Sequence, residues 1–570
     1  MSIRNSVFLV LFMITGAVFS QDLGSETVVV VKPYTPSVND AFKIRETPVI
    51  NDSLSLEKKP VQYSIFSVPV ASTFSPAKGR ATSVERERLP EVYENYATLA
   101  FGSYTNALAE FYSNLEVNRT DNFGIFLTHN SSQGGIEEVN FDDKYYETQV
   151  DLNYSSRQRN MSWNTDFGLE HRLFNWYGIP VGYQAQTLGE DFTQNYFSAY
   201  LGGEMNFEDS FFDGMKAKYR YFGDSFSSAE HHLTARPELE LPIAGEIFKT
   251  NIIFDYVTGS FEKGFSSEEE INYGFMNIGL SSGLVVLRDD LTLNLGAALY
   301  YSHDTNGDNS GVYLYPRINA SYRLAGEYFV AYAGLEGELK QNSYYSLSQE
   351  NWFVSPTLEI QPTDQQFDLY VGGKGKLSNS VGYDVRARYI AENYKPLFIK
   401  NPVVIGADEM EDYAYGNSFG VVYDRVNTIS GFGELNLDLS RKFNLRINGE
   451  YYIYDTDEQE EAWNLPDFKV SLLGDYQITE KWYAGANFFI VGERKDFFSL
   501  YSEALIQQTS EEVTLDGFVD LNANLGYRFN EQLSAFVRGN NLLGNNYERY
   551  MDFPVLGLQV MGGITYKFNY

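Results

Sequence analysis

Oxygen-bearing side chains recur at alternate positions in one short segment of the chain. Asp304, Asn306 and Asp308 stand two residues apart, with Gly307 between the last two. A calcium-binding loop spaces carboxylate and amide ligands in this way, because a hard cation takes oxygen ligands from a tight turn. The Glu that usually completes such a loop is missing at the expected position, and Asn, Asp and Gly are also ordinary loop residues. The segment therefore predicts either a calcium site or a plain loop.

The sequence Glu230-His231-His232 carries groups that could bind a transition metal. Adjacent side chains on a strand point to opposite faces, so three consecutive residues do not converge on one ion. The chain has five His and no Cys. It shows no Ser/His/Asp set with a local signature, no glycine-rich phosphate loop and no carboxylate pair spaced for acid–base catalysis. We therefore expect neither an enzyme nor a bound cofactor.

The charge of the chain is strongly acidic and unevenly placed. The net charge is −33, which argues against nucleic acid as a partner because phosphate binding needs a basic surface. Residues 21–90 hold 9 Lys/Arg and 8 Asp/Glu, whereas residues 91–570 hold 33 and 68. Acidic runs at 408–412 and 455–461 are typical of solvated loop faces, and could also collect cationic ligands or divalent ions.

The first twenty residues have the order of a secretory signal peptide. Arg4 precedes an apolar stretch, Val7–Ile14, and small residues follow up to Ser20. We expect cleavage near Ser20–Gln21 and export from the cytoplasm. The chain has no Cys for lipid attachment, so the exported protein is either soluble or spans a membrane by itself.

The elements that must carry these groups are β-strands. After the signal, no segment approaches the roughly 18 apolar residues of a membrane helix. The chain instead contains 44 Tyr, 42 Phe and 47 Gly, and from about Val92 runs of alternating apolar and polar residues appear. In Phe443–Tyr454 the apolar face carries Phe443, Leu445, Ile447, Gly449, Tyr451 and Ile453, and the other face carries Asn444, Arg446, Asn448, Glu450 and Tyr452. A second such run covers Leu515–Phe529.

Strand length decides between two all-β folds. Strands of soluble sandwiches are usually about 5–6 residues long, whereas these runs are about twice that length, as a tilted strand crossing a bilayer requires. Aromatic residues gather near strand ends, as in the girdles of a membrane barrel. Short turns at Thr479–Lys481 and Asn530–Gln532 alternate with longer polar segments. These are Asp455–Asp467, Lys495–Val513, Gly544–Gly557 and the stretch from Pro396 to Asp424.

The pattern predicts an all-β fold, a transmembrane antiparallel β-barrel of about 22 strands, within a range of 20–24. The alternation of upward and downward strands cannot be followed between Trp352 and Ile399. The predicted strand number is therefore given as a range of 20–24. A barrel of this size has a lumen that needs filling. The occupant could be the N-terminal segment, long loops folded inward, or another protein.

The last hundred residues resemble the barrel of the TonB-dependent receptors. The resemblance lies in three runs: LPDFKVSLLGDYQITEKWYAGANFFIVGERKD (465–496), LDGFVDLNANLGYRF (515–529) and LSAFVRGNNLLGNNYERY (533–550). Asn541-Leu542 is similar to a step that the family carries before its last outer loop. The chain closes with GITYKFNY, in which Gly563, Tyr566 and Phe568 resemble the signal read by the barrel-assembly machinery. Asn569 and Tyr570 follow this signal as two additional residues.

Two parts of the family pattern lie before the barrel. The family carries a folded plug of well over 100 residues, whereas residues 21–90 are few and hold 7 of the 17 prolines, so we expect an extended periplasmic arm and no plug. Near its start stand Glu26, Thr27, Val28, Val29, Val30 and Val31, where the resemblance places a TonB box. Such a segment would pair as an added strand with a sheet edge of its partner, or it is a generic strand that docks elsewhere.

The sequence therefore predicts a signal peptide at 1–20, an arm at 21–90 and an outer-membrane barrel at 91–570. The resemblance implies uptake of a nutrient or chelate across the outer membrane of a Gram-negative bacterium. The alternative is a plug-less scaffold or channel that holds partner proteins without energy-coupled transport. Expected partners are outer-membrane lipid and lipopolysaccharide, the barrel-assembly machinery, and TonB or a separate plug or lipoprotein.

Overall fold

A computed structural model describes residues 92–570, except 138, 140, 181, 183–191, 209, 244–245, 308, 406–409 and 503–506. The predicted signal peptide, the arm and the strand Glu26–Val31 lie outside the described residues. In the part of the chain that is described, no helix has the length and apolar character needed to cross a membrane.

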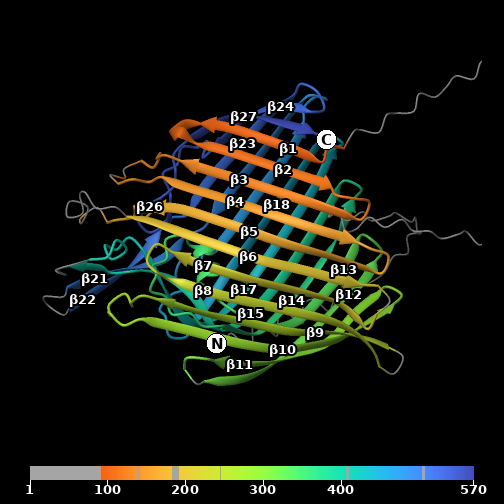
Figure 1. Cartoon of the computed structure of the whole chain (residues 1–570), viewed down its shortest axis with the longest axis horizontal. Coiled ribbons are helices and arrows are strands. Elements are labelled where there is room, and N and C mark those ends of the chain that lie inside the picture. Colours follow the sequence, from red (N-terminus) through yellow and green to blue (C-terminus); the bar gives the residue numbers. More distant parts are fainter. Residues whose placement is uncertain are drawn as a thin grey trace, which may run out of the picture. The chain divides into compact units, whose positions relative to one another are not determined.

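Twenty-two strands form one closed sheet (Figure 1). They are β1 (Asn95–Gly102), β2 (Ala107–Glu116), β3 (Asp121–Ser132), β4 (Tyr145–Arg157), β5 (Met161–Asn175), β6 (Thr193–Phe207), β7 (Phe212–Asp224), β8 (Ala229–Ile243), β9 (Glu246–Phe261), β10 (Ile271–Arg288), β11 (Leu291–Asp304), β12 (Ser310–Ala325), β13 (Phe329–Lys340), β14 (Thr363–Ser378), β15 (Val381–Lys400), β17 (Phe419–Ser440), β18 (Phe443–Thr456), β19 (Phe468–Gln477), β20 (Trp482–Val491), β23 (Phe518–Arg528), β24 (Leu533–Asn540) and β27 (Gln559–Phe568). Each strand pairs antiparallel with the next, and β27 pairs with β1, which closes the barrel and confirms the predicted fold.

Smaller elements lie in the connections between barrel strands. They are η2 (Ser103–Thr105), α2 (Tyr344–Glu350), β16 (Val403–Ile405), β21 (Arg494–Ser502), β22 (Gln507–Leu515), β25 (Glu548–Tyr550) and β26 (Phe553–Pro554). The stretch predicted as a polar loop at Lys495–Val513 is therefore mostly a hairpin of β21 and β22, which continues into a parallel pairing with β16. In Figure 1, β21, β22 and β26 lie at the end of the barrel opposite the C-terminus.

The two ends of the barrel differ in the length of their connections. At the end where β27 finishes, no connection exceeds four residues, and the turns predicted at Thr479–Lys481 and Asn530–Gln532 lie within two of these connections. At the opposite end many connections are much longer, for example segments 341–362, 401–418 and 541–558. Bacterial barrels place short turns in the periplasm and long loops outside. We call these ends the turn end and the loop end.

The range in which the strand alternation could not be followed from sequence, Trp352–Ile399, begins within a long connection, segment 341–362. This segment joins β13 to β14, holds α2 and contains no strand of the barrel. The predicted loop from Pro396 to Asp424 is also shorter than expected, because β15 runs to Lys400 and β17 begins at Phe419. Residues 396–400 pair with 419–423, so the barrel wall extends into the segment that was predicted to be a polar loop.

The two faces of each strand divide as the alternation predicted. In β18, Tyr451 and Ile453 are 55% and 54% exposed on the outer face. On the inner face Glu450 accepts the hydroxyl of Ser430 at 2.8 Å, and Asn448 accepts that of Ser471 at 2.7 Å. An apolar outer surface and a polar lumen are what a barrel in a bilayer requires.

A repeated arrangement braces the lumen wall. At four places a Tyr lies over a Gly of the adjacent strand and donates its hydroxyl to a carboxylate on the strand beyond. The sets are Tyr200–Gly168–Asp151, Tyr273–Gly259–Glu230, Tyr315–Gly337–Asp364 and Tyr332–Gly372–Asp384. A Cβ added at Gly168 would lie 2.1 Å from the Tyr200 ring, so the glycine makes room for the aromatic side chain. Each set joins three strands by side chains in addition to the backbone ladder.

Candidate functional site

A buried aromatic cluster lies at the loop end of the barrel, where the lumen would otherwise be polar. We call it the mouth cluster. Its buried members are Phe174, Trp176, Ile179, Phe192, Tyr196, Phe222, Val257, Phe261, Tyr273, Tyr344, Leu347, Val354, Leu358, Ile360, Phe398, Tyr413, Ala414, Phe419, Tyr550 and Phe553. They come from strand ends and from several connections of the loop end. Burial of this apolar surface holds these connections together inside one core.

Segment 341–362 places a short helix, α2, in this cluster. The helix begins after Ser343, whose hydroxyl accepts the N–H of Ser346 at 3.0 Å while the Ser346 hydroxyl accepts the N–H of Ser343 at 2.9 Å. This reciprocal cap satisfies two of the N–H groups that a helix start leaves unpaired. Tyr344 and Leu347 are buried on the face that meets the barrel.

Glu230, the second residue of β8, binds the first turn of α2. Its Oε2 accepts the N–H of Tyr344 at 2.5 Å and the hydroxyl of Tyr273 at 2.7 Å. Its Oε1 accepts the N–H of Tyr345 at 3.2 Å. The Glu230 residue is fully buried. A carboxylate at the start of a helix is favoured both by the unpaired N–H groups and by the helix dipole.

Arg172 of β5 binds the last turn of the same helix. Its Nη2 donates to the side chains of Gln349 and Glu170, each at 2.7 Å, and its Nη1 donates to the Ser348 carbonyl at 3.4 Å. The guanidinium also lies 4.7 Å from the centre of the Trp352 ring. A cation near the C-terminus of a helix complements its dipole. α2 is therefore held by opposite charges at its two ends.

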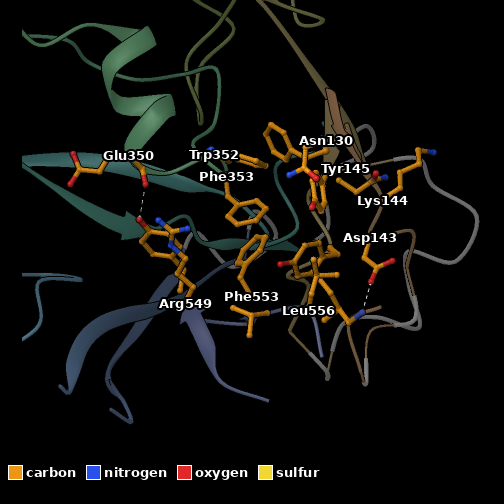
Figure 2. Close-up of a pocket in the computed structure, with 16 residues that line it drawn as sticks. Asn130, Asp143, Lys144, Tyr145, Glu350, Trp352, Phe353, Arg549, Phe553 and Leu556 are labelled. Atoms are coloured by element: carbon orange, nitrogen blue, oxygen red, sulfur yellow. Dashed lines mark hydrogen bonds between the residues drawn. The ribbon is translucent and has the colours of Figure 1, made fainter. Parts of the chain in front are cut away.

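A cavity of about 270 Å³ opens beside α2, and we call it the mouth cavity (Figure 2). It is lined by Asn130, Ile136, Asp143, Lys144, Tyr145, Phe174, Asn175, Tyr177, Glu350, Trp352, Phe353, Arg549, Tyr550, Phe553, Val555 and Leu556. Figure 2 shows Phe353 and Phe553 between two charged sides, with Glu350 and Arg549 on one and Asp143 on the other. The lining comes from connections far apart in the sequence.

The aromatic walls of the mouth cavity are fixed by contacts with each other. The rings of Phe353 and Phe553 stack with centres 4.0 Å apart, and Tyr177 lies 5.1 Å from Phe553. The Tyr177 hydroxyl donates to the Pro554 carbonyl at 2.9 Å, which fixes its ring. Rigid aromatic faces of this kind are typical of sites that bind apolar or flat groups.

The acidic groups at the cavity are partly desolvated. Burial raises the pKa of Asp143, although its Oδ2 accepts the N–H of Ile136 at 2.7 Å. Burial also raises the pKa of Glu350, an effect that Lys395, Lys469 and Arg549 partly offset. Across the described ranges, no group of three or more His, Asp or Glu residues could hold a metal ion. The cavity lining combines aromatic faces with charged groups at its edges.

Of the groups predicted from local spacing, only Glu230 lies at this site. Asp304 ends β11, and its Oδ1 accepts the N–H groups of Asn306 and Gly307 at 3.0 and 2.9 Å, which forms a capped turn. Asp308 lies outside the described residues, so the calcium interpretation stays a prediction. Glu230 and His232 face the lumen from β8, and His232 contacts Asp255 at 2.7 Å.

The residues of the predicted assembly signal lie at the seam that closes the barrel. Phe568 pairs with Asn95, Tyr566 with Ala97 and Gly563 with Ala100. A Cβ added at Gly563 would lie 2.5 Å from that of Ala100, so the seam needs glycine there. The additional residue Asn569 accepts the N–H of Glu94 and donates to the Val92 carbonyl, which lengthens the seam.

Sequence reasoning did not find Arg172, Glu230 or the cavity-lining aromatics as parts of one site. The available signal was local: Ser343 and Ser346 stand at capping positions, and the strand pattern stops there. The partners of α2 lie more than a hundred residues away along the chain. Their convergence depends on barrel closure, which no local pattern describes.

The closed 22-strand sheet, the short turns at one end and the apolar outer face define an outer-membrane β-barrel. Its fold is that of the barrel of the TonB-dependent receptors. No family model matches the chain, and no curated protein sequence matches it.

The similarity to solved structures concerns the fold. The FrpB iron transporter from Neisseria meningitidis aligns with a TM-score of 0.62 and 10% identity over 84% of this chain and 82% of that one. The siderophore receptor PirA from Acinetobacter baumannii gives 0.60 and 11%, over 84% and 81%. The pyoverdine outer membrane receptor FpvA from Pseudomonas aeruginosa gives 0.58 and 12%, over 84% and 79%. These structures are receptors and transporters rather than enzymes.

Proposed function

We propose that the protein takes part in uptake of a nutrient or chelate across the outer membrane, and that the mouth cavity is where the ligand first binds. The observation that carries this proposal is the position of an aromatic cavity at the loop end of a receptor-type barrel. Proteins of similar fold that transport iron or copper also support a function in uptake.

The chemistry of the cavity supports a ligand with apolar or flat groups and some charge. Phe353 and Phe553 supply a stacked face, and Arg549 and Lys144 supply cationic groups at its edges. A few aromatic anchors usually carry most of the binding energy of such a site. Substitution of either ring by Ala should therefore weaken binding more than substitution of an edge charge.

Energy for uptake would come through the N-terminal segment. The resemblance places a TonB box at Glu26–Val31, whose valines favour an extended strand that adds to a sheet edge of TonB. This coupling is part of the proposal and rests on the sequence alone.

The test is an uptake assay in cells that lack the gene and carry it on a plasmid. A panel of labelled ferric and copper chelates is offered under nutrient limitation. We expect one member to depend on the gene, and Phe353→Ala to reduce its uptake while the folded barrel persists. Phe529→Ala, an exposed aromatic substitution at a periplasmic turn, is the control. A panel transported equally with and without the gene would contradict the proposal.

A second candidate function is the scaffold, a barrel that holds partner proteins without transport of its own. One observation favours it: the residues that the structure describes belong to barrel strands, to their connections or to the chain ends, and none of these described residues forms a plug domain. Purification of the full chain in mild detergent distinguishes the two. A stoichiometric plug-like or lipoprotein partner together with unchanged uptake favours the scaffold.

A further inference from the structure

We propose that segment 341–362 is a strap that closes the outer end of the lumen, and that Glu230 and Arg172 hold it closed by binding the two ends of α2. This inference concerns access to the lumen, and it does not depend on what the mouth cavity binds.

The strap reaches walls on different sides of the barrel. It leaves the wall between β13 and β14, yet its helix is bound by β8 and β5, which lie five and eight strands before β13 in the ring of 22. In the other direction, the Ser355 N–H donates to the Phe419 carbonyl at the start of β17 at 2.8 Å. The Tyr550 hydroxyl, from the connection between β24 and β27, donates to the Glu350 carbonyl at 3.1 Å. A segment with these four attachments crosses the mouth.

The contacts at α2 are the ones whose loss would release the strap. A helix of seven residues is not stable by itself in water, so its contacts with the wall must keep it formed. Its first N–H groups depend on one buried carboxylate, Glu230, and its last turn depends on Arg172. Loss of the Glu230 charge would leave two buried N–H groups with a weaker partner and would free the helix start.

The far attachment of the strap is different in kind. Val354 forms a parallel bridge with Phe419, and Asn401 donates to the Ser355 hydroxyl at 3.0 Å. These are backbone and neutral contacts within the mouth cluster. The strap therefore has a hinge side near Ser355 and a charged latch side at α2, and its release would open the half of the mouth that faces β5 to β8.

The experiment measures access to the lumen from outside by thiol labelling, because the chain has no Cys of its own. Asn319→Cys places one thiol on the lumen face of β12, where Asn319 contacts Glu336. Asn306→Cys places a thiol in an exposed connection of the loop end as a reference. Each is combined with the native strap, with Glu230→Gln, or with a Gly/Ser linker in place of 344–350. Intact cells carrying the full chain are treated with a membrane-impermeant maleimide.

We expect slow labelling of Asn319→Cys with the native strap. Glu230→Gln should raise the rate by roughly tenfold or more, because the closed state loses a buried charged hydrogen-bond acceptor. The linker variant should approach the rate at Asn306→Cys. Glu240→Gln, which removes a half-buried carboxylate paired with Lys249 at the turn end of the same strand, should leave the rate unchanged.

A heat-modifiable band on a gel identifies assembled barrels in every sample, so only folded protein is compared. If the thiol of Asn319→Cys is labelled as slowly in the assembled linker variant as in the chain with the native strap, the strap does not close the mouth and the proposal is wrong. If the linker variant labels fast but Glu230→Gln does not, the strap closes the mouth without the Glu230 latch, and that half of the proposal is overturned.

Discussion

The Glu230 carboxylate accepts the backbone N–H of Tyr344 at 2.5 Å, across 114 positions of sequence. The same carboxylate accepts the Tyr273 hydroxyl, so one side chain belongs both to the Tyr–Gly–carboxylate bracing of the wall and to the start of α2. The stability of the wall and the position of the strap are therefore linked through one residue.

That link predicts the effect of Tyr273→Phe. The substitution removes a hydroxyl bonded to a buried carboxylate, a loss of about 1.5–3 kcal/mol in the free energy of unfolding. The midpoint of the heat-modifiable transition should fall. Tyr301→Phe, which removes an exposed hydroxyl bonded to Ser310, is the matched control and should change little. Equal midpoints for the two variants would contradict the role of Glu230.

The bracing itself predicts different outcomes for two glycine substitutions. A Cβ at Gly168 would meet the Tyr200 ring at 2.1 Å and displace it from Asp151, whereas a Cβ at Gly431 meets nothing within 4 Å. We expect Gly168→Ala to destabilise the barrel by about 1–3 kcal/mol, in the range of an overpacked core position. Gly431→Ala should be neutral. Denaturant unfolding in detergent or lipid measures both, and a neutral Gly168→Ala would argue against the bracing.

The seam predicts an assembly defect. Deletion of Thr565–Tyr570 removes half of the residue pairs between β27 and β1, and an open sheet edge is not viable in lipid. The amount of folded, heat-modifiable protein should fall steeply, and Phe568→Ala should lower it to a smaller extent. Asn569→Ala, which removes two hydrogen bonds at the end of the seam, tests whether the residues beyond the usual signal contribute. Normal folded levels in all three variants would contradict the prediction.

The outer hairpin predicts a pH effect. Burial raises the pKa of Asp496 to about 6, against an ordinary value of 3.8, with Lys400 close to its carboxylate. Because the folded state binds this proton more tightly, the contribution of Asp496 to stability is greatest at low pH and is lost as pH rises through about 6. Limited proteolysis of the β21–β22 hairpin should therefore be slower about one unit below that pKa than one unit above it. Asp496→Asn should remove most of the difference, and an unchanged difference would assign it to another group.

The alternation of apolar and polar residues along the strands was sufficient to predict the barrel. In β18 each inward or outward position follows from the strand period of two, because lipid and lumen select opposite side chains. α2 has no such pattern: its residues are mostly polar or aromatic, and its helical state depends on Glu230 and Arg172, which are distant in sequence. The mouth cavity was hidden for the same reason, since Phe353 and Phe553 meet only when the barrel closes.

The last prediction concerns the N-terminal segment, whose pairing is inferred from sequence. An extended chain reaches about 3.3–3.6 Å per residue, so the residues between Val31 and the barrel could span the periplasm to a partner. Strand pairing uses backbone N–H groups, so Val29→Pro should abolish it, whereas Val29→Thr should be mild because a β-branched residue keeps the strand. If Glu26–Val31 couples the barrel to TonB, the proline variant should assemble normally yet lose uptake and capture of TonB in a pull-down. A proline variant that equals the native chain in both measurements would remove the TonB-box interpretation and leave the scaffold as the better account.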